Sequence, residues 1–265
     1  MPSKRNSKPS TEPVRLFIGS GEASLVERKT LIYSIQKNTR RSLDITVFNG
    51  THNAIEKNDA KPYLAPLSLK TKYLNITEFS LYKFLIPKLC GYKGKAIWLD
   101  SDMICLSDIG ELFDAPMRGH DFLAKRNGAS KNRPWELSAL LIDCSRCRFG
   151  LETFTKEIHR GLYRYQDLMH MSPAFLSRHP YRIGRMEDNW NALDERKPRT
   201  KLVHYTNLFT QPWKYTRHPL QRLWLQYFKE AVRSQFLTLS DVQKTVLRSY
   251  VQPKLLRIAI RNANG

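Results

Sequence analysis

Two aspartates, Asp100 and Asp102, stand one residue apart at the end of the apolar stretch KAIWLD at 95–100. Ligands of open α/β sheets bind outside the carboxyl ends of the strands. Two carboxylates at such a point repel each other and lose hydration, so they need a cation. Mn²⁺ and Mg²⁺ favour carboxylate together with phosphate oxygens. The pair, with a turn at Ser101, predicts a site for a metal-bound diphosphate. Two solvated loop carboxylates are the alternative, since D-x-D is common.

The elements that must position this pair follow from the apolar spacing. A short buried strand at 14–20, a helix at 24–38 and a second strand at 43–49 predict a βαβ unit, for which a parallel sheet is the default. Residues 50–76 read as irregular. A helix is expected at 77–91, with Pro87 near its end. Further strands are expected at 95–100, 121–126, 137–143 and 201–206.

Length and composition bound the function. The chain has 265 residues, enough for one large α/β domain or two small ones, and its net charge of +20 predicts attraction to nucleic acid, a phosphorylated ligand or an acidic membrane surface. It has no apolar run of about 18 residues that would span a membrane. We expect residues 1–13 to form a disordered basic leader that is not a secretory signal. Three of the four cysteines lie in or beside apolar runs and read as buried side chains, and the one C-x-x-C, at Cys144 and Cys147, has no second pair to complete a zinc site; a reducing cytoplasm fits this pattern.

The segment SLYKFLIPKLCGYKGKAIWLDSDMICLSDIGELF at 80–113 resembles the nucleotide-sugar glycosyltransferases of family 8, which have the GT-A fold. RKTLIYSIQKNT resembles the first helix of that family, RPWELSALLIDCSR a later strand, EDNWNALDE its Trp-Asn element and KLVHYTNLFTQPW its His motif. The resemblance implies an α/β fold. We expect one GT-A, Rossmann-like domain at 14–219 with a mostly parallel central sheet, followed by a basic amphipathic helical extension at 220–265.

The resemblance also implies roles for individual residues. Asp100, Asp102 and His204 match the metal ligands, and Mn²⁺ or Mg²⁺ is the expected ion. Without the resemblance, His204 would read as a core histidine. The implied catalytic segment is Gln166 and Asp167. The residues expected to bind the nucleotide sugar are Gly19, Ser20, Glu22, Lys83, Ser101, Ser138, Asn191 and Lys214. On the acceptor side we expect Trp190 and Trp213, although a core position for Trp213 is an equal alternative.

Several positions depart from the pattern of the family. Only Glu22 is available where the family has an acidic pair after the first strand. Asn207 and Gln211 replace the Gly and Lys of the His motif, so that Lys214 or Lys201 would have to contact phosphate instead. These changes put donor affinity in doubt.

The resulting hypothesis is a metal-dependent, retaining glycosyltransferase. It would move a hexose from a nucleoside-diphosphate sugar, with UDP expected, to a glycan or lipid-linked acceptor. From Lys214 to Gly265 there are ten Lys or Arg against two Asp or Glu. This basic tail predicts contact with an anionic membrane, and hence a cytoplasmic protein that is peripheral on the inner membrane face. The alternative is that the apolar stripe of the helix at 218–236 packs on the catalytic domain and the basic residues form a solvated face. A nucleic-acid-binding or nucleotidyl-transferring protein and a catalytically silent GT-A scaffold remain alternatives, but we expect no specific nucleic acid partner.

Overall fold

The computed structural model describes residues 12–52, 54–57, 63–64, 79–128 and 130–263. The predicted leader at 1–13 therefore lies almost wholly outside the described residues. Within them, the main sheet has the strand order β4-β3-β2-β1-β5-β8-β7-β9. Its strands are β1 (Val14–Ser20), β2 (Leu43–Asn49), β3 (Ala54–Lys57), β4 (Tyr63–Leu64), β5 (Lys95–Asp100), β7 (Phe122–Arg126), β8 (Trp135–Asp143) and β9 (Ile183–Arg185). The α/β fold class predicted from the sequence is confirmed.

The predicted βαβ unit consists of β1, helix α1 (Leu25–Asn38) and β2, and both β2 and β5 pair with β1 in parallel. The sheet as a whole is mixed rather than mostly parallel. β8 runs antiparallel to both β5 and β7, and β3 runs antiparallel to β2. The short connections at 50–53 and 127–134 explain this difference, because a crossover to a parallel neighbour needs a dozen or more residues. β3 and β4 also lie inside the region that was expected to be irregular.

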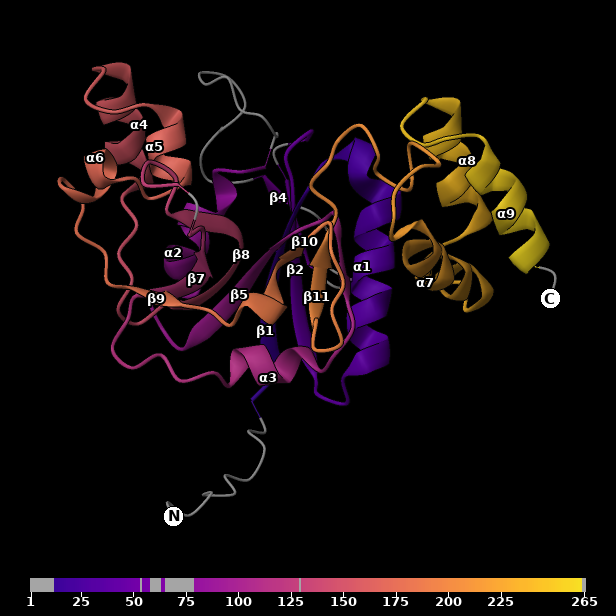
Figure 1. Ribbon diagram of the computed structural model, residues 1–265, viewed down its shortest axis with the longest axis horizontal. Coiled ribbons are helices and arrows are strands. Elements are labelled where there is room, and N and C mark those ends of the chain that lie inside the picture. Colours follow the sequence, from indigo (N-terminus) through magenta and orange to yellow (C-terminus); the bar gives the residue numbers. More distant parts are fainter. Residues whose placement is uncertain (1–11, 53, 58–62, 65–78, 129, 264–265) are drawn as a thin grey trace, which may run out of the picture.

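Helices cover both faces of the main sheet (Figure 1). One face packs against α2 (Ile86–Leu89), α4 (Leu151–His159), α5 (Tyr165–Met169) and α6 (Pro173–Leu176), and the other against α1 and α3 (Ile109–Phe113). The helix expected at 77–91 is shorter than predicted, since a 3₁₀ turn at Tyr82–Leu85 precedes α2. Pro87 stands in the first turn of α2, where its missing N–H costs no helical hydrogen bond. Residues 77–78 lie outside the described residues.

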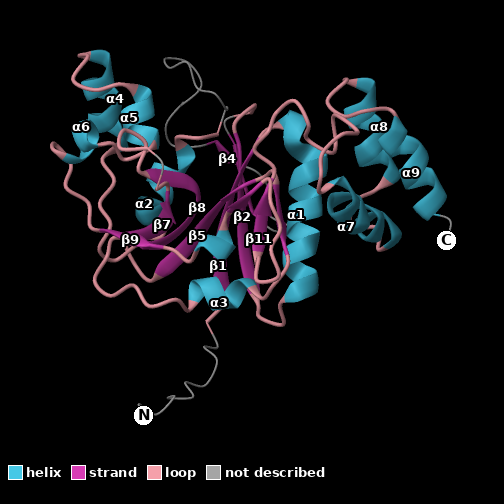
Figure 2. Ribbon diagram, viewed as in Figure 1, coloured by secondary structure: helices cyan, strands magenta, loops and turns pink. Residues whose placement is uncertain are grey.

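A second, smaller sheet has the order β10-β11-β6 and consists of β10 (Ala192–Leu193), β11 (Leu202–His204) and β6 (Met103–Cys105). β11 is the strand expected at 201–206, and it pairs antiparallel with β6. β11 is drawn beside α1 in Figure 2, and Val203 of β11 shares a buried apolar cluster with Val26 of α1. Because β6 follows β5 after a two-residue bend, the two sheets meet at the end of β5.

Three helices complete the chain: α7 (Gln221–Arg233), α8 (Leu239–Leu247) and α9 (Lys254–Ala263). They lie beside α1 on the side away from the main sheet (Figure 1). Trp224, Phe228, Leu255 and Ala259 are buried in one apolar cluster with Trp213 of the preceding segment. The apolar stripe predicted for this region therefore packs inward, with the basic side chains left on the outside. Among the described residues, no helix is both long and apolar enough to cross a membrane.

Candidate metal and nucleotide-sugar site

The two sheets bring three potential metal ligands together. β5 ends at Asp100, Ser101 and Asp102 form a bend, and β6 begins at Met103. His204 is the last residue of β11 and pairs in register with Met103, so its side chain is delivered beside the bend. Ligand atoms of Asp100, Asp102 and His204 all lie within 4.8 Å of one another. The turn predicted at Ser101 is present, and its side chain is buried.

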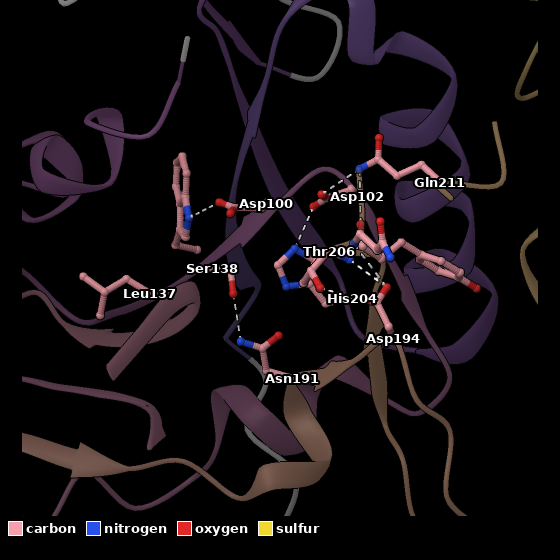
Figure 3. Close-up of polar contacts among 12 residues, drawn as sticks. Asp100, Asp102, Leu137, Ser138, Asn191, Asp194, His204, Thr206 and Gln211 are labelled. Atoms are coloured by element: carbon pink, nitrogen blue, oxygen red, sulfur yellow. Dashed lines mark hydrogen bonds and ion pairs between the residues drawn. The ribbon is translucent and has the colours of Figure 1, made fainter. Parts of the chain in front are cut away.

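Asp102 and His204 are in direct contact. Nε2 of His204 lies 3.0 Å from Oδ1 of Asp102 (Figure 3). The contact is close but poorly aligned, since Oδ1 of Asp102 and Nδ1 of His204 are both buried without a hydrogen-bond partner among the described residues. Oδ2 of Asp102 accepts a longer bond of 3.4 Å from Nε2 of Gln211. Buried atoms of this kind indicate that a ligand belongs at the site.

Asp100 has a different set of neighbours. Its Oδ1 accepts a hydrogen bond of 2.9 Å from Nε1 of Trp98 and lies 3.9 Å from Nζ of Lys83. Lys83 is 3 % exposed, donates to the carbonyl of Leu137 at 2.9 Å and lies over the Trp98 ring. Lys83 is therefore a buried cation beside the acidic pair and does not lie on a solvated helix face.

Burial and neighbouring charges shift the pKa values of Asp100, Lys83 and His204. Burial raises the pKa of Asp100 above its ordinary value, an effect that Lys83 opposes. Burial also lowers the pKa of the Lys83 ammonium. For His204 burial alone would lower the pKa, but the adjacent Asp102 carboxylate raises it above its ordinary value. Two carboxylates are thus balanced by Lys83 and a readily protonated His204, and a divalent cation would replace the histidine proton.

The donor set fits Mn²⁺ or Mg²⁺. Two carboxylates and one imidazole are hard to intermediate ligands, and a diphosphate would supply the remaining oxygens. Oδ1 of Asp102, which lacks a hydrogen-bond partner among the described residues, and Nε2 of His204, which faces it at 3.0 Å, are the atoms that an ion would use. Asp100, Asp102 and His204 would hold it.

Ser138 and Asn191 meet beside the ligands. Nδ2 of Asn191 donates to Oγ of Ser138 at 2.9 Å, and Oδ1 of Asn191 is buried without a partner among the described residues (Figure 3). Nζ of Lys125 donates to the Asn191 carbonyl at 2.7 Å. Ser138 and Asn191, both predicted from the sequence, are therefore joined to each other, and one buried amide oxygen is left without a hydrogen-bond partner among the described residues.

The first βα turn lies at the same edge, because Gly19 of β1 pairs with Asp100 of β5. A Cβ on Gly19 would overlap the Trp98 and Phe79 rings, so this glycine is required for packing. Ser20 is fully buried, and its Oγ accepts a hydrogen bond from Arg28. Glu22 opens a 3₁₀ turn (Glu22–Ser24), and its N–H donates to Oγ1 of Thr51 at 2.8 Å. Only Glu22 of the predicted trio is partly exposed.

The predicted catalytic segment lies on α5. Asp167 caps the start of this helix, since its carboxylate accepts from the Arg164 N–H at 2.8 Å and from Oγ of Ser172 at 2.9 Å. Those hydrogen bonds hold the pKa of Asp167 below its ordinary value although burial alone would raise it. Gln166 is exposed. Asp167 therefore has a structural task, and a catalytic one stays a prediction for both residues.

The two tryptophans expected on the acceptor side are core residues. Trp190, in a 3₁₀ turn (Asp188–Trp190), is 3 % exposed and packs on the face that holds α3. Trp213 is 1 % exposed and packs against Trp224 with ring centroids 5.5 Å apart. Neither ring has enough exposed surface to stack on a sugar. Lys214 follows Trp213 and is exposed.

Some residues around the site carried no signal in the sequence. Gln211 was noted only as a replacement for lysine, yet its amide contacts Asp102 and the Tyr205 carbonyl. Glu27, on α1, is buried, and its charge acts on the site through Asp102 and Lys214. Asp194 was quoted only as part of the Trp-Asn element. Their roles arise from contacts between distant segments, which spacing along the chain does not encode.

The thiol that interacts with Cys144 belongs to Cys90 and not to Cys147, its partner in the C-x-x-C motif. The thiol of Cys90 forms a hydrogen bond with that of Cys144, which contributes most to holding the pKa of Cys90 at about 7. Cys144 and Cys147 are buried and Cys90 is partly exposed. All four cysteines are free thiols.

Comparison with known proteins supports the fold assignment. No protein-family profile matches the chain. A curated relative, "Protein CDI" of Arabidopsis thaliana, is 27 % identical over 235 residues, which cover 78 % of this chain and 82 % of the relative.

Three solved glycosyltransferases have a similar structure. The bifunctional glycosyltransferase WbbM superposes with a TM-score of 0.58 at 15 % identity over 82 % of this chain and 49 % of WbbM. GlyE of Streptococcus pneumoniae TIGR4 gives 0.58 at 17 % identity over 81 % of this chain and 60 % of GlyE. The galactosyltransferase LgtC, solved with donor and acceptor sugar analogues, gives 0.57 at 10 % identity over 82 % and 96 %. The chain thus spans about half to three-fifths of WbbM and GlyE but nearly all of LgtC. It has the GT-A fold that these glycosyltransferases share.

Proposed function

We propose that this chain is a metal-dependent glycosyltransferase. Its substrate would be a nucleoside-diphosphate hexose, with a uridine nucleotide expected, and its acceptor a glycan or lipid-linked sugar. The observation that carries the proposal is the cluster of Asp100, Asp102 and His204 at the strand ends of a GT-A fold. The galactosyltransferase neighbour was solved with donor and acceptor analogues, which is in keeping with this reaction class.

The proposed reaction makes one bond and breaks one. The acceptor hydroxyl oxygen forms a bond to the anomeric carbon while the bond from that carbon to the diphosphate oxygen breaks, and the electron pair leaves with the diphosphate. In a front-face, retaining course the acceptor proton passes to the departing phosphate oxygen. A bound Mn²⁺ or Mg²⁺ would supply electrostatic stabilisation of the growing charge.

The residues of the chain have separate tasks in this proposal. Lys83 favours the ionised form of Asp100 through the contact at 3.9 Å and adds positive charge near the leaving group. Asn191, fixed by its bond to Ser138, offers a free amide oxygen to a sugar hydroxyl. Lys214 is the exposed cation that follows Pro-Trp and would contact phosphate in place of Gln211, whose neutral amide is held by Asp102 and Tyr205. Front-face attack requires no carboxylate nucleophile, which agrees with the capping bonds of Asp167.

A membrane-apposed acceptor is part of the proposal. The tail from Asp241 to Gly265 has five basic residues and one acid, and its exposed positions include basic residues of α9. Each Lys or Arg near an anionic surface contributes about 1 kcal/mol of attraction. The support for this part is charge alone, because the apolar side chains of α7 and α9 are largely engaged in packing. Co-sedimentation with anionic and neutral vesicles at low and high salt tests it, and equal recovery with both would contradict it.

A donor screen tests the central proposal. Thermal unfolding is measured with UDP, GDP and their sugars, each with and without Mn²⁺. A ligand at about 100 times its Kd stabilises the folded state by roughly 2.7 kcal/mol, which is readily observed. We expect a shift that needs both Mn²⁺ and one nucleotide sugar, and its loss in Asp102→Ala. Asp188→Ala is the matched control, because Asp188 is an exposed acid paired with Arg185.

Other results would point elsewhere. Absence of any Mn²⁺-dependent shift would favour the silent scaffold, for which the replacement of lysine by Gln211 is the supporting observation. Salt-dependent retention on DNA that nucleotide sugars do not displace would favour a nucleic-acid-binding protein. A shift that persists in the Asp102 variant would contradict the assignment of the metal ligands.

A further inference from the structure

Asp194 occupies a constrained backbone position next to the metal site. It follows β10 directly and has a φ of 51°, in the left-handed region that asparagine and aspartate tolerate better than most residues. Its N–H donates to the carbonyl of His204 at 2.8 Å. The backbone of a proposed metal ligand is therefore attached to Asp194.

The Asp194 carboxylate binds both ends of one segment, residues 206–218. At the first end, Oδ1 accepts from the Thr206 N–H at 2.9 Å, and Oδ2 accepts from the Thr206 hydroxyl (Figure 3). At the other end, Nε2 of His218 lies 3.0 Å from Oδ1. His218 is buried, and its Nδ1 accepts from the Leu220 N–H at 3.0 Å, so Nε2 carries the proton and donates to Asp194.

The segment closed in this way reaches back to the other ligand. Gln211 lies within it and donates to Oδ2 of Asp102 at 3.4 Å. The residue just before the segment, Tyr205, donates its N–H to the Asp102 carbonyl at 2.9 Å. Compact surface loops whose ends are held together are frequently functional. Asp194 thus acts on His204 through the backbone and on Asp102 through Gln211.

We propose that Asp194 is a positioning residue that aligns His204 and Asp102 for the metal ion by closing the segment at 206–218. The inference rests on the proposed metal-dependent function and extends it by one residue. Asp194 does not act as a metal ligand, since its oxygens are occupied by the N–H and hydroxyl of Thr206 and by His218. Such outer partners orient ligands, and their loss typically lowers metal affinity about 10- to 100-fold.

The first test measures the affinity for Mn²⁺ alone, from the electron paramagnetic resonance signal of the free ion. The main variant is Asp194→Asn, which keeps the size and the left-handed backbone but replaces the negatively charged carboxylate, to which Thr206 and His218 donate, with a neutral amide. We expect affinity to fall about 10- to 100-fold, with saturation regained at higher Mn²⁺ concentration. The control is Asp188→Asn, the same change at an exposed acid in the preceding turn. Equal affinity of a folded Asp194→Asn protein and wild type would overturn the inference.

A second variant covers the case in which Asp194→Asn does not fold. His218→Gln keeps a donor for Asp194 but loses the acceptor for the Leu220 N–H, so we expect a smaller fall in Mn²⁺ affinity than for Asp194→Asn. The inference would also be overturned if His218→Gln bound Mn²⁺ as tightly as wild type and the amide hydrogens of the segment at 206–218 exchanged at an unchanged rate.

Amide hydrogen exchange separates this inference from the proposed function. In Asp194→Asn, peptides from 205–218 should exchange at least about tenfold faster, while peptides of α1 should not change. Unchanged exchange at 205–218 would refute the closing role whether or not the protein binds Mn²⁺. If wild type itself fails to bind Mn²⁺ although exchange responds as expected, the metal proposal fails, and with it the part of the inference that concerns ligand alignment.

Discussion

Glu27 on α1 allows a quantitative test of the electrostatics near the site. Its side chain is 4 % exposed, and its Oε2 has no hydrogen-bond partner among the described residues. Burial raises the pKa of Glu27 to about 7 from an ordinary 4.5, with Lys214 opposing the effect and Asp102 adding to it. The folded chain therefore resists ionisation of this carboxylate far more than the unfolded chain does.

The sign and size of the effect follow from linkage. Below pH 4.5 Glu27 is protonated in both states and has no effect on the free energy of unfolding. As pH rises from 4.5 to about 7, the unfolded chain ionises first, and stability is lost. Above that range the loss is complete, at about 3 kcal/mol for the difference between the two pKa values. Glu27→Gln removes the charge, so it should stabilise the protein by up to this amount at alkaline pH.

Urea denaturation near pH 5 and near pH 8 measures this prediction. We expect Glu27→Gln to match wild type within about 1 kcal/mol at the lower pH, because Glu27 of the folded chain is still protonated there and only a small part of the loss has developed. The stabilisation should then grow with pH. Glu152→Gln is the control, since Glu152 is an exposed acid in the first turn of α4. A Glu27→Gln protein that gains no stability between the two pH values would refute the assignment of a buried carboxylate with a raised pKa.

Two further predictions concern a thiol and the C-terminal helices. Cys90 should be the first thiol alkylated by iodoacetamide near pH 7, because it is partly exposed and the neighbouring Cys144 thiol holds its pKa at about 7. Peptide mass mapping measures the order of labelling, and another cysteine labelled first would contradict this prediction. Leu255→Ala should lower the free energy of unfolding by about 2–5 kcal/mol, whereas Ile260→Ala, at a position 47 % exposed, should change it by less than about 0.5 kcal/mol. Equal effects in urea denaturation would mean that α9 does not complete the core.

The parts of the site that could be predicted are those encoded locally. Asp100 and Asp102 follow an apolar strand, and His204 ends another, so each carries a signal within a few residues of itself. Strand direction has no such signal. β8 is apolar enough to lie anywhere in the sheet interior, and the short connection from β7 accounts only for its antiparallel pairing with β7, not for its antiparallel pairing with β5.

Contacts between distant segments could not be predicted in the same way. Asp194 and His218 are 24 residues apart and joined across a loop, and neither position belongs to a periodic pattern. Glu27 was not found because a polar residue on a helix is normally assigned to the solvent face. That assumption fails for α1, which has packing partners on two sides.

The position of α1 between the main sheet and α7–α9 has an evolutionary consequence. Polar residues of α1 such as Glu27, Thr30 and Ser34 are buried. A descendant that lost the C-terminal helices would expose apolar α1 residues such as Val26, which packs with Trp224. Gain or loss of these helices therefore requires compensating substitutions in α1, and the two segments should change together among descendants of this chain. A graft of the N-terminal part alone onto another scaffold would inherit a helix adapted to a partner that it no longer has.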